Sequence, residues 1–487
     1  MKLLGYAPDL DTTIEGVITD CSAFVPDVKG MVSAPSAQQA SAAALSAACY
    51  GAAAVKKLDN TSRMIAGTAA ALYELSGGAW TDVTRTVGGA YSLSADNRWR
   101  FAQFGDTTLA VSKTDILQYS SSSNFANVAG APKADIVETV GYFVFLANTT
   151  EGTYGDSPNR WWCAALGNYT DWTPSVSTQC ATGILTSAPG RIFAAKRFGE
   201  QIVFYKQKAM YLGTYVGAPV IWNMQQVPGE IGCSSQDGVV NIGTDQNPVH
   251  LFMGDDDFWV FDGSRPTSIG SPVRKTVFSN LYAAYAYRIK TVHDQKNKRV
   301  YFYYPSLGGN GAVDSCVVYN YKTNTWGRDD RTIEAALEYI SGGITYDTWS
   351  SVAATYDTLP TTISYDSPFY SSGTPTPAIF DTTHKINTLD GVSTTSSFTT
   401  GDFGDDSAFS LIQRVKPKFQ VAPTSATMTN YYKNSLGDTL VQDATVSMGV
   451  SRFDLLRAAR WHRLKFDFVG NSTLNEINIV AQDGGYE

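Results

Sequence analysis

Apolar and polar residues alternate along much of the chain in short runs, a pattern typical of β-strands that bury one face. From Arg463 to Phe468, charged residues occupy every second position and apolar residues fill the others. The run from Arg299 to Tyr304 is apolar or aromatic at nearly every position, as expected for a strand buried on both faces. Gly, Asn, Asp and Ser cluster between such runs, where they favour tight turns. The pattern predicts an all-β protein.

One arrangement of strands recurs six times within residues 46–340. Each copy begins with a hairpin, continues with a third strand that carries aromatic residues, and closes after a polar turn on a large apolar residue. The closing residues, in order, are Trp80, Phe125, Trp172, Trp222, Ile269 and Trp326. The hairpin turns recur at intervals of about 36 to about 58 residues, around the period of ~40–50 residues of a propeller blade. We predict a six-bladed β-propeller, with an open array of meander sheets or a β-solenoid as the alternative.

Changes in composition divide the rest of the chain. Residues 1–45 are expected to form an extended segment that packs on the propeller or closes it. Residues 341–395 are rich in Ser, Thr and Pro, which predicts loops and a linker, with strands that complete the propeller as a further option. Residues 396–487 return to clean alternation and predict a C-terminal β-sandwich.

Charge and cysteine content narrow the class of protein. The 487 residues include 37 Lys and Arg against 45 Asp and Glu, a net charge of −8, which argues against a broad basic face that grips nucleic acid. The six cysteines form no C-x-x-C pair, so we expect free, mostly buried thiols in a chain made in a reducing cytoplasm, with scattered disulfides as the alternative. The uncharged stretch of residues 30–55 consists largely of Ala and Ser, so no membrane span is predicted.

Catalytic motifs are missing from the sequence. The four histidines lie far apart, and no G-x-S-x-G elbow or Walker A motif is present. The acidic run from Asp255 to Asp257 separates two apolar runs, so a hairpin turn is expected there in preference to a Ca²⁺ site. We therefore predict no enzyme activity and no catalytic, cofactor-binding or metal-binding residues.

One basic cluster stands out near the C-terminus, interleaved with aromatic residues. Its members are Arg452, Arg457, Arg460, Arg463 and Lys465. The functional interpretation is contact with phosphate or with an acidic partner protein. The alternative is the solvated face of a sandwich strand with ordinary loop charges.

Several short segments along the chain carry a resemblance to a known family. They are Tyr6–Asp11, Gly16–Cys21, Phe24–Pro26, Lys29–Met31, Ala34–Ser36, Ala66–Thr68, Trp80, Arg98–Phe101, Phe104–Asp106, Arg299–Pro305, Val318–Asn320, Trp326 and Arg457–Arg463. Together they resemble the tail hub or nozzle proteins of short-tailed (podovirus) phages, also called packaged-DNA stabilisation proteins. The resemblance begins at the N-terminus and continues along most of the chain, although residues 330–450 contribute almost nothing to it.

The resemblance implies a structural virion protein of the phage tail. Such proteins form a homo-oligomeric ring, typically a hexamer, below the portal and adaptor proteins, and they carry the needle, plug or fibre proteins of the distal tail. The ring continues the channel for double-stranded DNA, which passes through the lumen without sequence-specific binding, and it retains the packaged DNA until ejection. The family has no catalytic residues to transfer to this chain.

Two other functions remain open at this point. A carbohydrate-binding, receptor-binding propeller would use exposed aromatic residues such as Trp161 and Trp162 to stack sugars, although core packing is the expected role of both. A propeller glycosidase would need a pair of neighbouring carboxylates, which sequence spacing alone cannot identify.

Overall fold

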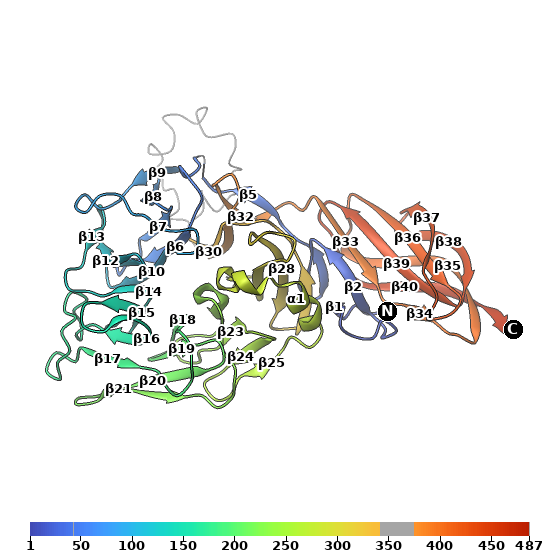
Figure 1. The fold of residues 1–487 in the computed structure, drawn as a ribbon. Coiled ribbons are helices and arrows are strands. Elements are labelled where there is room, and N and C mark those ends of the chain that lie inside the picture. The colour runs from blue at the N-terminus through green and yellow to red at the C-terminus, as the bar shows by residue number, and fades with distance from the viewer. Residues whose placement is uncertain (42, 341–374, 487) are drawn as a thin grey trace.

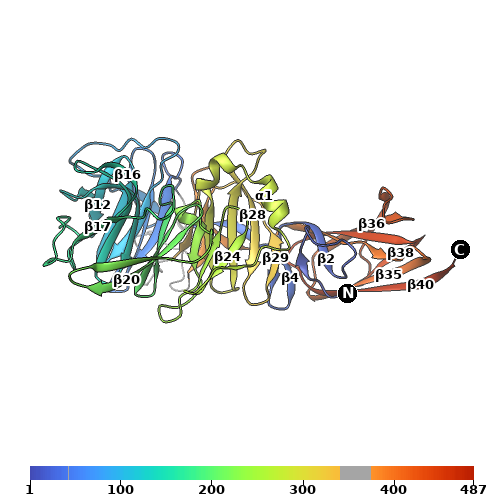
Figure 2. The ribbon, with the colours of Figure 1, turned by 60° about the horizontal axis from the view of Figure 1, so that its bottom comes forward.

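The computed structural model describes residues 1–41, 43–340 and 375–486. The regular secondary structure of the described residues is almost entirely β-strand. A ring of small sheets forms one part of the molecule, and an elongated pair of sheets extends from one side of it (Figures 1 and 2).

Four separate antiparallel sheets in the ring have four strands each, as propeller blades do. They are, in chain order of their first strands, β6 (Gly51–Lys56), β7 (Ser62–Gly67), β8 (Leu72–Ser76) and β9 (Ala79–Asp82); β18 (Ala194–Phe198), β19 (Gln201–Tyr205), β20 (Met210–Gly217) and β21 (Ile221–Gln226); β22 (Val239–Asn241), β23 (His250–Met253), β24 (Phe258–Phe261) and β25 (Thr267–Ser268); and β30 (Ala335–Tyr339), β31 (Thr376–Phe380), β32 (Ile386–Gly391) and β5 (Ser36–Gln39).

Three further four-stranded units lie within larger sheets. Two of them share an eight-stranded sheet, and the third begins a nine-stranded sheet. Their strands are β10 (Arg100–Phe104), β11 (Thr107–Ser112), β12 (Asp115–Ser120) and β13 (Ala126–Asn127); β14 (Lys133–Val140), β15 (Phe143–Glu151), β16 (Gly155–Cys163) and β17 (Ala181–Ile184); and β26 (Lys290–Asp294), β27 (Arg299–Pro305), β28 (Val313–Asn320) and β29 (Thr325–Arg328).

The first strands of these units contact one another in a closed circle. The order is β6, β10, β14, β18, β22, β26 and β30, and β30 contacts β6 again. The prediction of an all-β, propeller-like arrangement is therefore confirmed, but the described residues contain four separate four-stranded blades and not the six expected. The six-fold repeat did not include the sheet β30–β31–β32–β5, because its outer strand comes from the N-terminus and no short hairpin joins β30 to β31. Only the expectations that residues 1–45 close the propeller and that strands of residues 341–395 complete it allowed for this sheet.

The six predicted hairpin turns all fall between the first and second strands of a unit. Trp80, Trp222 and Trp326 lie in fourth strands, as their closing positions suggested. Trp172 lies outside any strand, in the long loop before β17, where its ring is buried and its Nε1 donates to the Tyr169 carbonyl at 2.9 Å. In this unit the loop itself supplies the large closing side chain.

Two sheets make up the elongated part of the molecule (Figure 2). One contains β1 (Gly5–Tyr6), β2 (Val17–Ser22), β33 (Thr395–Thr400), β39 (Trp461–Val469), β36 (Ser425–Lys433) and β37 (Val441–Ser447), with β34 (Phe403–Gly404) paired to β39. The other continues from β29 through β3 (Phe24–Asp27), β4 (Gly30–Ser33), β40 (Thr473–Tyr486), β35 (Ala408–Val421) and β38 (Phe453–Ala459). We call these two the C-terminal sheets.

In the part of the chain that the structure describes, helical structure is limited to short pieces. These are the α-helix α1 (Arg274–Asn280) and the 3₁₀ turns η1 (Gln236–Gly238) and η2 (Ala283–Arg288). Among the described helices, none has the length and apolarity of a membrane-crossing segment. All six cysteines are buried and free, as the sequence predicted.

Within the segment of residues 341–395, strands β31 and β32 form part of a blade. The predicted loops between residues 341 and 374 lie outside the described residues.

Candidate functional site at the junction of the propeller and the C-terminal sheets

The N-terminal segment joins the propeller to the C-terminal sheets by pairing with each in turn. Strand β2 pairs with β33, β3 pairs with the blade strand β29, β4 pairs with β40, and β5 pairs with β32. Fewer than forty residues thus contribute strands to three different sheets. The name junction is used below for β1–β4 and the residues packed against them.

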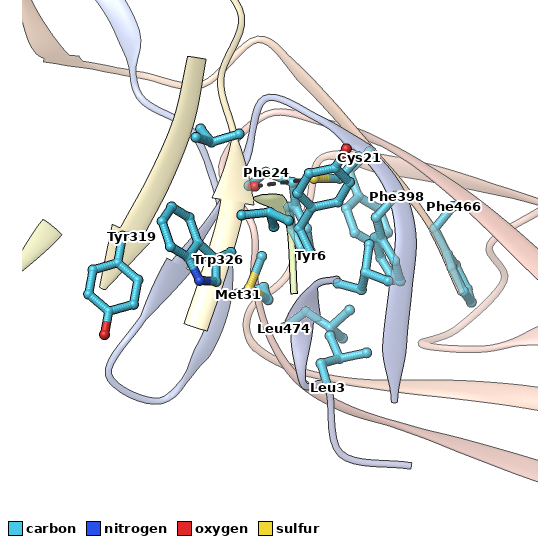
Figure 3. Packing of buried hydrophobic residues seen from close by; sticks show 14 of the residues in the cluster. Leu3, Tyr6, Cys21, Phe24, Met31, Tyr319, Trp326, Phe398, Phe466 and Leu474 are labelled. Carbon is cyan, nitrogen blue, oxygen red and sulfur yellow. Dashed lines mark hydrogen bonds between the residues drawn. The ribbon is translucent and has the colours of Figure 1, made fainter. Parts of the chain in front are cut away.

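A stack of aromatic rings forms the centre of the junction. Phe24 of β3 stacks on Phe398 of β33 with ring centroids 4.9 Å apart, and Phe398 stacks on Phe466 of β39 at 4.9 Å. On the propeller side, Trp326 of β29 belongs to the same buried cluster, together with Leu474 of β40 (Figure 3). Phe24 is fully buried. The hydrophobic core is therefore continuous from the propeller into the C-terminal sheets.

Two glycines allow the backbones to approach closely at this point. Gly30 has φ +135°, and a Cβ atom added there would lie 2.4 Å from the Leu474 carbonyl oxygen of β40. Gly5 has φ +89°, and an added Cβ would lie 2.8 Å from the Trp326 carbonyl oxygen. Any larger residue would force the N-terminal strands away from their partners.

Buried polar groups lock the N-terminal segment to both sides. The Arg299 guanidinium of β27 is buried, where its Nε donates to the Pro26 carbonyl at 2.6 Å and its Nη2 to Asp27 at 3.1 Å. On the opposite side, the Ser33 hydroxyl lies 2.8 Å from that of Ser396 and 2.6 Å from that of Ser472. Because buried polar groups are costly when unpaired, these bonds specify the register of the segment.

Asp9 ties the first loop of the chain to α1 on the propeller. Its carboxylate accepts hydrogen bonds from the backbone N–H of Lys275 and of Thr276, at 2.5 and 3.0 Å, and from the Thr276 hydroxyl. A carboxylate at the first turn of a helix satisfies N–H groups that have no intrahelical partner.

The titratable groups of the junction are poorly suited to reaction chemistry. Burial raises the pKa of the Cys21 thiol and of the Tyr6 hydroxyl well above their ordinary values, so both stay neutral. Within the described ranges, no three His, Cys, Asp or Glu side chains gather closely enough to hold a metal ion. The arrangement fixes two parts of the molecule to each other.

The predicted basic cluster lies on and beside β38 and β39, and acidic partners neutralise most of it. Arg457 forms two hydrogen bonds with Asp443, at 2.7 and 2.8 Å, and these bonds lower the pKa of Asp443. Arg463 likewise forms two with Asp402, at 2.8 and 3.0 Å. The weaker pairs are Arg452–Asp454 at 3.1 Å and Lys465–Asp467 at 3.6 Å.

Arg460 differs from the other four members of this cluster. Its guanidinium lies 4.9 Å from the centre of the Phe409 ring, and no acidic partner is found for it among the described residues. The structure therefore does not bring the five cations together as one free positive patch. Contact with phosphate or with an acidic partner stays a prediction.

Asp402 is a residue that the sequence pattern did not single out. It is buried and bonds Arg463, Lys433 and the Thr12 hydroxyl, so it links the N-terminal segment to the C-terminal sheets. Burial alone would raise the pKa of Asp402, but the hydrogen bonds from Arg463 and Lys433 outweigh burial and lower it. A sign of this site was present in the sequence only through Arg463, a member of the basic cluster, because Asp402 lies 61 residues away from it along the chain.

Comparisons with known proteins add little to this description. No family model matches the chain, and no curated protein matches it.

The solved structures that resemble it do so weakly. A chain of the mitotic checkpoint complex matches with a TM-score of 0.39 and 7% identity, over 73% of this chain and 91% of that one. YCF48 bound to D1 peptide matches with a TM-score of 0.39 and 11% identity, over 75% and 97%. The extracellular domain of a hybrid two-component system from B. thetaiotaomicron matches with a TM-score of 0.41 and 8% identity, over 80% and 44%. Likeness at this level supports no statement about function.

Proposed function

We propose that the chain is a structural protein of a short-tailed phage tail, a nozzle or hub subunit without enzyme activity. Copies of it form a ring, which we expect to be a hexamer, below the portal and adaptor proteins. The ring continues the DNA channel, retains the packaged DNA and carries the distal tail parts. The proposal rests on the sequence resemblance, and the structure supplies one observation in its favour.

That observation is the convergence of the segments that resemble the tail-hub family. Segments near the N-terminus and in the propeller, distant in sequence, contribute side chains to a single buried cluster. The side chains are Tyr6, Ile18, Cys21, Phe24, Met31, Val300, Phe302, Tyr304, Tyr319 and Trp326. Other matching segments pack elsewhere, as Trp99 and Phe101 do, so the shared cluster supports the resemblance for the N-terminal segments and for β27–β29.

The same proposal includes the finer architecture. The seven four-stranded units would form a seven-bladed propeller that β5 closes with an N-terminal strand, and the C-terminal sheets would form a β-sandwich. A body of two rigidly joined parts suits a ring subunit, since one part can contact its neighbours while the other part binds tail proteins.

Open sheet edges offer a surface for contact between copies. Strands β37 and β38 each pair on one side only within the described chain, and they contact each other. Leu456 of β38 is 80% exposed, and Val450 in the preceding turn is 93% exposed. Unpaired edges with exposed apolar side chains favour association.

Native mass spectrometry of the purified chain, alone and mixed with its adaptor partner, tests the proposal. We expect a closed ring, and we expect Leu456→Glu to shift it towards monomers. Leu58→Glu is the matched control, because Leu58 is 77% exposed on a propeller hairpin, and it should leave the ring intact. A chain that stays monomeric with its adaptor would overturn the proposal.

The carbohydrate-binding alternative gains no support from the tryptophan pair. Trp161 and Trp162 are each 6% exposed and pack in the propeller core, so neither offers a face for stacking a sugar.

A further inference from the structure

Three neighbouring cavities have walls in common near the first strands of the propeller units. An outer cavity of about 580 Å³, lined mostly by loops, shares Arg100 and Gln236 with a smaller cavity of about 150 Å³. The smaller cavity shares Lys196 and Asp237 with a third cavity of about 440 Å³. Residues of the first strands β6, β10, β18, β26 and β30 line the smaller cavity, which is called the axial cavity below.

Three cations and a single carboxylate line the axial cavity. Arg100 comes from β10, Lys196 from β18 and Lys290 from β26, while Asp237 belongs to η1. The rest of the wall consists of Gly51, Ala52, Ala53, Trp99, Phe101, Gln236, Ala335 and Ala336. The small residues of β6 and β30 leave open the space towards which the longer cationic side chains extend.

The cations are incompletely paired. Lys290 donates to Asp237, which satisfies one charge. The Arg100 Nη1 bonds Asp135 at 3.0 Å, but its Nε has no hydrogen-bond partner although the side chain is only 8% exposed. Lys196 is half-buried and forms no ion pair among the described residues, although Asp237, Glu138 and Glu338 lie close enough to interact with its charge. The lining therefore carries three cations against one carboxylate, and within it only the charge of Lys290 is paired.

Two other carboxylates lie near the axial cavity without lining it. Glu138 and Glu338 line the third cavity. Burial raises the pKa of Glu138, and it raises the pKa of Glu338 to about 7, so both bind protons more readily than ordinary glutamates.

We propose that the axial cavity binds a small oxyanion of the phosphate or sulfate class through Arg100, Lys196 and Lys290. The Arg100 guanidinium has N–H donors beyond the Nη1 group that bonds Asp135, and the two ammonium groups supply charge from other blades. The cavity is larger than the ~30 Å³ that one water occupies in the liquid, and it lacks room for a large organic anion. The bound anion would link three blades, and this role is independent of the proposed tail function.

Isothermal titration calorimetry with inorganic phosphate, and separately with sulfate, tests the inference on the full chain. We expect saturable binding with one site per chain, and a rise in melting temperature beyond that produced by sodium chloride at equal ionic strength. Lys196→Met removes a charge without a hydrogen bond to lose within the protein, and it should weaken binding by about 10-fold or more.

The matched control is Lys208→Met. Lys208 is an exposed lysine on the β19–β20 hairpin of the same blade, so its loss lowers the net charge equally while leaving the axial cavity intact. It should bind phosphate as the native chain does. No binding of either anion by the native chain would overturn the inference, as would equal binding by Lys196→Met. Arg100→Lys, which keeps the charge and removes the guanidinium donors, should give an intermediate loss.

Discussion

The blade β18–β21 and the sheet β30–β31–β32–β5 have the same four-stranded form, but the chain builds them in opposite ways. The first is a continuous run of residues 194–226 with a short turn at each step. The second takes one strand from the N-terminus, and residues 340–375 separate its first two strands. The junction is built like the second, from segments hundreds of residues apart. The same pattern of hydrogen bonds between four strands can therefore be made by strands that follow one another in the chain or by strands far apart in it. Only the first kind leaves a repeat in the sequence.

The largest expected effect comes from Phe24→Ala in the junction. Removing this fully buried ring deletes the centre of the aromatic stack, and we expect a loss of about 3–5 kcal/mol in the free energy of unfolding. Phe204→Ala in β19, where the ring is equally buried, is the matched control from a locally built blade. Urea unfolding gives the magnitudes, and hydrogen exchange gives the location of the loosened strands.

The comparison predicts different patterns of exchange for the two variants. Phe24→Ala should speed exchange in β29, β33 and β40 together, because the junction joins these strands. Phe204→Ala should act mainly on β18–β21. If Phe24→Ala left the C-terminal sheets as protected as before, the junction would not be a cooperative link between the two parts.

Gly30→Ala tests the close approach between the backbones of β4 and β40, two strands that are far apart in the sequence. Both Gly30 and Gly141 have positive φ, but only at Gly30 would a Cβ collide with another backbone, that of Leu474. Gly141→Ala, at a hairpin tip with nothing within 4 Å, should lose about 1–2 kcal/mol from the backbone conformation alone. Gly30→Ala should lose about 3 kcal/mol in the same thermal or urea measurement. Equal losses of stability in the two variants would show that β4 and β40 can move apart at little cost in free energy.

The local units could be predicted because their turns carry Gly and Asp at the positions that tight turns need, as at Gly105 and Gly199. Strand β5 could not, because Ser36–Gln39 has no apolar alternation and its partner β32 lies some 350 residues away. The basic cluster could be found as cations, but its partners Asp402 and Asp443 could not. The partner of a strand or of a charged side chain depends on which strands become neighbours in the fold. The periodicity of a single sequence does not give this information.

Asp402→Asn tests a polar link between remote segments. The native carboxylate holds Lys433, Arg463 and Thr12, so we expect the variant to be about 2 kcal/mol less stable at neutral pH. Because the folded state lowers the pKa of Asp402, its stabilisation is full above the ordinary carboxyl pKa and fades as the pH falls through the folded value. The difference in the free energy of unfolding between the native protein and the variant should therefore become smaller below about pH 4.

Asp59→Asn is the corresponding local control. Asp59 is exposed and bonds only within its own hairpin turn, to the backbone and hydroxyl of Thr61, and these bonds lower its pKa. At neutral pH, the decrease in melting temperature should be smaller for this variant than for Asp402→Asn. A larger decrease for Asp59→Asn would mean that the hydrogen bonds within one hairpin turn stabilise the protein more than those that join distant segments.

Glu338→Gln is expected to act in the opposite direction from the other variants. Glu338 lies on β30, the first strand of the remotely built sheet, and burial raises its pKa to about 7. A folded state that raises a carboxyl pKa binds more protons than the unfolded chain, so native stability falls as the pH rises from the ordinary value of ~4.3 towards about 7. Glutamine cannot ionise, so the stability of the variant relative to the native protein should rise between these two pH values and stay constant above about pH 7. Melting temperatures of both proteins between pH 5 and pH 8 would measure this, and parallel curves would mean that β30 leaves Glu338 in contact with water.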